Sequence, residues 1–170
     1  MKNLLLSAGA MLALFPALAL ADGAKVCFEA EKPVRIESPL RKTMNKDAKA
    51  SAKSFLEIPW DQNKSAGQGS ATYTFNAPKA GVYTLWARCF WANGCGNSIL
   101  ASVNGSDGKI LGEDGTYDAW HWVGGRARVK LQAGKNTLVL KNRETGVRVD
   151  QFFLTQDGDY NPVGKRPVTS

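Results

Sequence analysis

The chain has 170 residues, of which 44% are hydrophobic and 22% are charged, with 17 glycines and 7 prolines. These proportions exclude a disordered chain, a collagen and a coiled coil, and the glycine and proline content disfavours a helical bundle. The formal net charge is +7. Lys and Arg are nevertheless spread along the chain without a run of five or more, so the charge does not indicate a nucleic-acid partner.

The first 21 residues have the three-part pattern of a secretory signal peptide. Lys2 precedes an apolar segment that runs to Leu20, and Ala19 and Ala21 are the small residues that a signal peptidase reads. The apolar run is shorter than the ~20 residues needed to span a bilayer, so we expect no membrane span. The sequence therefore predicts a secreted or periplasmic protein with one domain over 22–164 and a flexible tail over 165–170.

Short strand-like runs separated by turn residues fill the mature chain, and no long amphipathic helix is present. The segment 38–53 is polar and basic and is predicted to be a loop. Asn104-Gly105 is a strong hairpin signal. This pattern is typical of an all-β sandwich or jelly roll. The predicted strands are 26–31, 54–58, 70–75, 81–89, 98–103, 117–123, 126–131, 136–141 and 147–155.

The three cysteines allow one disulfide bond in an oxidising compartment. Cys89 and Cys95 flank a short loop, so we predict a bridge between them and a buried Cys27 thiol. A bridge from Cys27 to either of the other two remains an open alternative.

The sequence holds no recognisable catalytic constellation. It has no Gly-x-Ser-x-Gly elbow and no phosphate-cradling glycine loop, and His121 is its only histidine. Four acidic residues could serve glycoside hydrolysis, but their spacing singles out no pair. They are Glu113, Asp114, Asp118 and Glu144. We therefore predict a protein that is not an enzyme.

Aromatic residues beside turns are the clearest functional signal. Flat indole and phenol rings stack on the apolar faces of sugars, while amide and guanidinium groups pair with sugar hydroxyls. Trp60 follows Pro59 in one such turn. Trp86 lies within a predicted strand, so the alternative to ligand contact is that it packs in the core. One of Trp120 and Trp122 is expected to face inward. The candidate ligand-binding residues are Trp91, Tyr117, Trp120, Trp122, Asn142 and Arg143.

Two glutamates two residues apart, Glu29 and Glu31, fall on one face of the first strand because side chains alternate along a strand. Oxygen ligands of this kind favour calcium. The alternatives are a solvated edge strand or pairing with Lys32 or Arg35.

The ordered set of motifs resembles carbohydrate-binding modules of families 6 and 35 and their relatives. The resemblance runs over nearly all of 26–164. The matching motifs include Phe28-Glu-Ala-Glu31, Gly69–Phe75, Ala80–Arg88, Trp120-His-Trp122, Asn142–Gly146 and Val149-Asp150.

The resemblance implies a galactose-binding-like jelly-roll β-sandwich with a structural calcium held by Glu29, Glu31 and Asp150. It also implies a sugar site among aromatic loop residues, where Trp120 and Asn142 match best and Trp91 lies in the next loop. We therefore expect an exported, non-catalytic module that binds a polysaccharide or oligosaccharide. The alternative is a structural or protein-interaction β-sandwich of the cell envelope without a sugar site.

Overall fold

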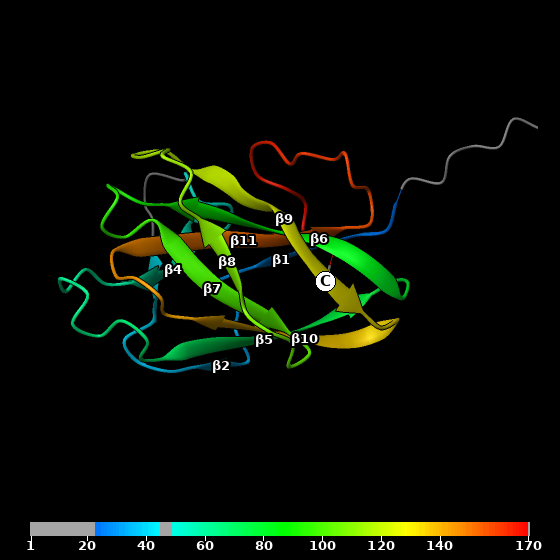
Figure 1. The fold of residues 1–170 in the computed structure, drawn as a ribbon, viewed down its shortest axis with the longest axis horizontal. Coiled ribbons are helices and arrows are strands. Elements are labelled where there is room, and N and C mark those ends of the chain that lie inside the picture. The colour runs from blue at the N-terminus through cyan, green and yellow to red at the C-terminus, as the bar shows by residue number, and fades with distance from the viewer. Residues whose placement is uncertain (1–22, 45–48, 170) are drawn as a thin grey trace, which may run out of the picture.

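The computed structural model describes residues 23–44 and 49–169, so the predicted signal peptide lies outside the described residues. The described chain is all-β, without a helix (Figure 1). Its strands are β1 Lys25–Glu29, β2 Arg35–Ile36, β3 Arg41–Met44, β4 Ser54–Ile58, β5 Ser70–Ala77, β6 Gly81–Phe90, β7 Ser98–Val103, β8 Lys109–Gly112, β9 His121–Leu131, β10 Gly134–Lys141 and β11 Val147–Thr155.

The strands form two antiparallel sheets that pack face to face, which confirms the predicted jelly-roll β-sandwich. One sheet has the order β3-β4-β11-β6-β9, and the other has the order β2-β5-β10-β7-β8. The first half of β11 pairs with β4, and its second half pairs with β1. Strands β8 and β9 are therefore the edge strands on one side of the sandwich.

Alternation along the strands builds the core between the sheets. On β6 the inward residues are Tyr83, Leu85, Ala87 and Cys89, all buried, and on β10 they include Leu138 and Leu140. The rings of Phe28, Tyr73 and Phe152 meet in this core with centroids 5.2–5.6 Å apart. The Tyr73 hydroxyl donates to the Ala30 carbonyl at 2.7 Å, so the buried phenol is satisfied.

Sequence-based assignments change at three places in the structure. The first predicted strand, 26–31, ends at Glu29, so Glu31 lies in the turn that follows it. The predicted loop 38–53 contains the edge strand β3, which pairs with β4. The runs 117–123 and 126–131 do not form two strands, because 117–120 lies in a loop and one strand, β9, continues through a register shift beside β6. Gly124 permits this shift: its φ is +129°, and a Cβ there would lie 2.3 Å from the Leu85 carbonyl oxygen. The Asn104-Gly105 hairpin joins β7 to β8 as predicted, with positive φ at both residues.

The segment after β11 returns along the edge of β1. Arg166 N–H donates to the Gln151 side chain, and Gln151 Nε2 donates back to the Arg166 carbonyl. Thr169 and Cys27 exchange two further hydrogen bonds at 2.8 and 2.9 Å. Residues 165–169 of the predicted flexible tail therefore hydrogen-bond to the sheet, and they cover Cys27.

The structure holds all three cysteines as free thiols and does not contain the predicted Cys89–Cys95 bridge. Cys89 points into the core from β6, whereas Cys95 is exposed in the following loop. Burial raises the pKa of the Cys27 thiol to about 12 and raises that of Cys89 well above its usual value. The two buried thiols are therefore protonated and shielded.

We predict that the unfolded protein titrates three thiols per chain with an aromatic disulfide reagent. In the native protein at neutral pH only Cys95 should react quickly, because the thiolate is the nucleophile and the other two thiols are buried and protonated. If Cys27 were the sole thiol of the unfolded protein, the result would support the Cys89–Cys95 disulfide bond and contradict the structure.

Candidate functional site

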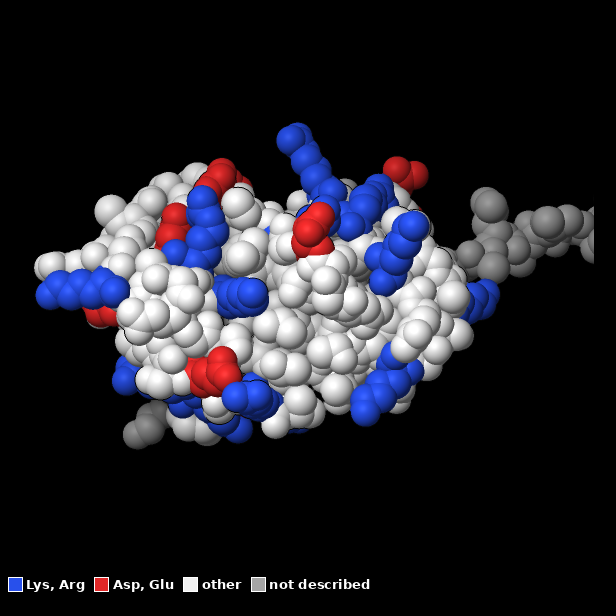
Figure 2. Space-filling model, turned by 60° about the horizontal axis from the view of Figure 1, so that its bottom comes forward, with Lys and Arg blue, Asp and Glu red and all other residues white. Residues whose placement is uncertain are grey.

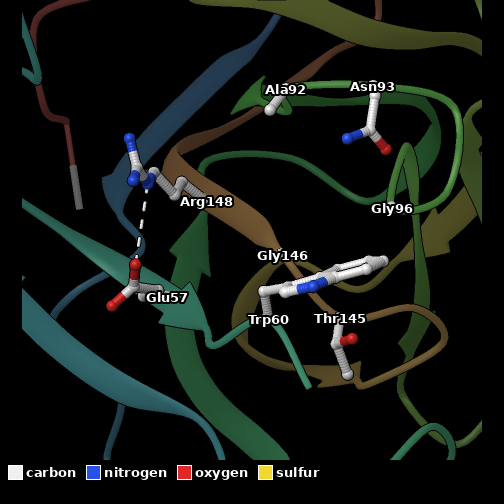
Figure 3. A pocket seen from close by; sticks show the side chains of 8 residues that line it. All are labelled: Glu57, Trp60, Ala92, Asn93, Gly96, Thr145, Gly146 and Arg148. Atoms are coloured by element: carbon white, nitrogen blue, oxygen red, sulfur yellow. Dashed lines mark ion pairs between the residues drawn. The ribbon is translucent and has the colours of Figure 1, made fainter. Parts of the chain in front are cut away.

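A cleft at one end of the sandwich has a volume of about 320 Å³. It lies where the loops after β4, β6 and β10 meet the start of β11. Figure 3 shows the Trp60 indole along one wall, with the Asn93 amide across from it and Arg148 and Glu57 at one end. The complete lining is Glu57, Trp60, Ala92, Asn93, Gly96, Thr145, Gly146 and Arg148.

Trp60 is the one exposed tryptophan of the described chain, with 53% of its surface accessible. Pro59 ends β4, and the chain then turns so that the indole lies against Gly146. A Cβ at Gly146 would approach Trp60 Cε3 to 3.0 Å, and the φ of +85° at Gly146 independently favours glycine. The ring is therefore supported on one face and open to the cleft on the other.

Hydrogen bonds around Asn63 and Thr145 hold the Trp60 loop in place. Asn63 Oδ1 accepts from the Thr145 N–H at 2.8 Å and from its hydroxyl at 3.0 Å. Asn63 N–H donates to Thr145 Oγ1 at 3.1 Å, and Asn63 Nδ2 donates to the Cys95 carbonyl at 3.1 Å. These bonds tie the Trp60 loop to both neighbouring loops, so the aromatic wall is preorganised.

Charged groups at the end of the cleft are paired. Arg41 donates two hydrogen bonds to Glu57 Oε2 at 2.9 and 3.0 Å, and Thr43 adds a third at 3.0 Å. Arg148 Nε lies 3.6 Å from Glu57 Oε1. The Arg148 guanidinium also lies over the rings of Phe55 and Phe90, which fixes its orientation. The cleft thus offers a flat apolar ring beside oriented amide and guanidinium groups.

None of the six predicted ligand residues lines the Trp60 cleft. Trp91 is completely buried with its ring edge-on to His121, so the expectation that it stacks on a sugar is wrong. Asn142 is buried and donates to the Ser65 carbonyl at 2.8 Å, so it braces the Trp60 loop from below. Arg143 forms ion pairs with Glu113 and Glu144 at 2.8 and 2.9 Å, outside the cleft lining.

The other three predicted ligand residues also lie outside the cleft lining. Tyr117 is exposed, and its hydroxyl lies against Gly94, behind the loop that carries Asn93. Trp120 is half-buried, with its ring centroid 5.6 Å from that of Phe55. Trp122 donates its indole N–H to the Gly164 carbonyl at 2.8 Å and so packs against the C-terminal segment.

A second group of functional interest lies between β1 and β11. Asp150 is completely buried, and its carboxylate pairs with Arg88 at 2.5 Å and accepts from the Ser51 N–H at 2.8 Å. The Ser51 hydroxyl, which has one proton to donate, lies within hydrogen-bond distance of both Asp150 Oδ1 and Glu29 Oε2. Glu29 Oε1 accepts from Gln151 at 3.2 Å. Glu31 is buried, yet neither of its carboxylate oxygens has a hydrogen-bond partner among the described residues.

The three carboxylates of this group outnumber Arg88, the one cationic side chain paired with it among the described residues. Burial raises the pKa of the Glu31 carboxyl and the nearby carboxylates of Glu29 and Asp150 add to this rise, while interactions with its own backbone N–H and with the Ser54 hydroxyl oppose it. Within the described residues no three His, Cys, Asp or Glu side chains are arranged as a metal site. The orphaned oxygens of Glu31 and the negative excess over Arg88 nevertheless fit a hard cation.

The described residues also contain no helix that could cross a membrane.

We predict that Asn63→Gly lowers the free energy of unfolding by about 1–2 kcal/mol, because it removes the side-chain bonds that hold the Trp60 loop. Glycine keeps the positive φ of +61°, so backbone strain does not contribute. Gln62→Gly is the matched control, because Gln62 has the same φ of +61° and an exposed side chain. Urea denaturation measures both, and equal midpoints for the two variants would contradict the role given to Asn63.

Comparisons with known proteins agree with the observed architecture. No protein-family model and no curated protein sequence matches the chain. Among solved structures, a family 35 carbohydrate-binding module from Clostridium thermocellum is 20% identical with a TM-score of 0.58, over 76% of this chain and 97% of that one. The C-terminal family 6 module of a marine laminarinase from Zobellia galactanivorans is 17% identical with a TM-score of 0.56, over 78% of this chain and 99% of that one.

Larger enzymes match over one part of their length. A Podospora anserina β-(1,4)-mannanase that carries a family 35 module is 19% identical with a TM-score of 0.61, over 85% of this chain. The chain spans 29% of the length of that mannanase. The structure therefore has the β-sandwich fold of carbohydrate-binding modules of families 35 and 6.

Proposed function

We propose that the protein is a non-catalytic carbohydrate-binding module that binds one or two sugar units of a glycan in the Trp60 cleft. The observation that carries the proposal is an exposed indole fixed in a cleft of about 320 Å³ among polar groups. A volume of this size is at the lower end of the usual range for small-ligand sites. The shared fold supports the proposal, as do the modules named above, which are carbohydrate-binding modules by their own description.

The groups of the cleft have distinct roles in this proposal. Trp60 stacks on the apolar face of a sugar ring, and burial of that face drives binding. The exposed Asn93 offers its Nδ2 group to a sugar hydroxyl, and its direction is set because Asn93 Oδ1 accepts from the Cys95 N–H at 2.9 Å. Arg148, held by Glu57 and by two phenyl rings, offers its remaining N–H groups to a hydroxyl or an acidic substituent. The cleft lining has one carboxylate, Glu57, whose Oε2 accepts three hydrogen bonds and whose Oε1 faces Arg148, and this pairing supports the proposed non-catalytic role.

We also propose a structural calcium ion held by Glu29, Glu31 and Asp150. Calcium is a hard cation that takes carboxylate oxygens, and it would supply the charge that Glu31 lacks. Because β1 carries Glu29, the turn after β1 carries Glu31 and β11 carries Asp150, the ion would fasten β1 and its turn to β11. The signal-like pattern over 1–21 supports a secreted or periplasmic location, where calcium is available.

Trp60→Ala should weaken glycan binding by about tenfold or more, because an aromatic anchor in a cleft carries a large share of the binding energy. Trp60→Phe should recover part of the affinity, since a flat ring remains. Val82→Ala removes an equally exposed apolar side chain far from the cleft and should leave binding unchanged. Affinity electrophoresis through gels that contain single polysaccharides measures all four proteins, with a glycan array to choose the polysaccharides.

Binding that survives Trp60→Ala would contradict the cleft. A folded protein that binds no member of a broad array would favour the alternative of a structural β-sandwich.

Calcium should raise the melting temperature of the wild type, because an ion that binds only the folded state stabilises it by mass action. The melting temperature of Glu31→Gln should lie above that of the wild type without calcium and below it with calcium. In chelator it should melt above the wild type, since the neutral amide avoids burying an unpaired charge. With calcium it should melt below the wild type, since a ligand is missing. Differential scanning calorimetry tests this crossing, and identical wild-type curves with and without calcium would remove the ion from the account.

A further inference from the structure

The side of the sandwich where β8 and β9 meet carries a second recessed surface, remote from the Trp60 cleft. Two hollows of about 400 and 290 Å³ lie along it. We call it the β8–β9 groove and define it by Val103, Asn104, Ser106, Asp107, the segment 108–112, Gly124 and the segment 126–130. Gly108, Gly112 and Gly124 contribute no side chains to the first hollow, which keeps it open.

Four cationic residues line the β8–β9 groove, and a single acidic residue, Asp107, accompanies them. Three of the cations alternate along β9, where Ala127 and Val129 between them point into the core. Alternate residues on a strand lie about 7 Å apart on the same face, so these side chains form a row. The four are Lys109, Arg126, Arg128 and Lys130.

The charge of the groove is not neutralised, in contrast to the loop end of the sandwich. There, Arg41, Arg148 and Arg143 each pair with a glutamate. In the groove, Arg128 donates to the Thr84 hydroxyl, and Lys109, Arg126 and Lys130 form no ion pair with another described residue. Figure 2 shows that Lys and Arg outnumber Asp and Glu on the face drawn, as the net charge of +7 requires.

The shape and chemistry of the groove identify the class of ligand. A row of cations without acidic partners attracts an extended anion. The residues that line the two hollows include no aromatic side chain, so the groove lacks the stacking platforms that single-stranded nucleic acids use. A linear acidic polysaccharide, which presents carboxylate or sulfate groups at regular intervals, matches these requirements.

We propose that the β8–β9 groove is a second binding site, which takes a linear acidic polysaccharide through ionic contacts. This site shares no lining residue with the Trp60 cleft and does not depend on it. A protein with both sites holds a glycan by stacking at one end and an acidic chain along its side. The two contacts together would raise the avidity for an acidic matrix.

The probe for the test is heparin, with polygalacturonate as a carboxylate-only chain and dextran as a neutral chain. The groove variant is Lys109→Gln, Arg126→Gln and Lys130→Gln combined. The control is Lys32→Gln, Lys64→Gln and Lys79→Gln combined, which removes the same charge from exposed positions outside the groove. Isothermal titration at several salt concentrations measures affinity, and circular dichroism checks that each variant is folded.

The wild type should bind heparin and polygalacturonate but not dextran. Its affinity should fall on the order of 100-fold between about 50 and 200 mM salt, as four ionic contacts would imply. The groove variant should lose about tenfold or more in affinity and show a shallower salt dependence, while the control loses much less.

Equal losses in the two variants would show that net charge alone attracts the polyanion, and the site would be rejected. Single-stranded DNA that binds as tightly as heparin would reject the polysaccharide assignment. The groove variant should keep the wild-type affinity for a neutral glycan selected on the array, because it changes no residue of the Trp60 cleft, so failure of the Trp60 cleft and failure of the groove are distinguishable.

Discussion

The buried carboxylate of Asp150 is the constraint on which the rest of the structure depends. It lies in β11, the strand that pairs with β1, β4 and β6, at the point where the register beside β6 shifts. Arg88 on β6 neutralises it, and Ser51 joins it to Glu29 on β1. A buried charge without these partners would cost several kcal/mol, so three strands and one loop must take fixed positions around it.

The position of the cleft follows from this arrangement. Gly146 directly precedes β11, and Arg148 lies at its start. Strand β4 pairs with this stretch up to Ile58, whose carbonyl accepts from the Gly146 N–H at 2.8 Å. Trp60 therefore rests on Gly146, and Glu57 meets Arg148, because the two strands are held in register. An indole on a fixed backbone loses little entropy on binding, which makes a shallow cleft sufficient for a sugar.

Much of the fold could be predicted from the sequence, because alternation and turn residues are local signals. The same alternation, extended by one step, places Trp91 with Tyr83, Leu85, Ala87 and Cys89 on the inward side of β6. The alternation of side chains along this strand was therefore enough to predict that Trp91 and the Cys89 thiol are buried. Gly124 and Gly125 separate the predicted strands 117–123 and 126–131 in the sequence, and they hid the continuity of β9, because the register shift at this point depends on contact with β6.

The site itself was less accessible to sequence reasoning. Pro59 ends β4, so strand parity says nothing about the direction of Trp60, and its exposure depends on Gly146, which lies far away in the sequence. Asn142 and Arg143 are polar residues next to a loop, but tertiary contacts with Ser65, Glu113 and Glu144 determine what they do. Such long-range pairs leave no periodic pattern.

The most direct test of the account is the indole N–H region of a two-dimensional NMR spectrum during titration with a glycan that the protein binds. Each tryptophan gives one resonance there, and Trp60→Phe assigns its own signal. The account predicts that the Trp60 resonance shifts or broadens first and that the Trp91 resonance, from a buried ring, stays in place. A titration that moves the resonances of Trp120 or Trp122 and leaves Trp60 unchanged would contradict it.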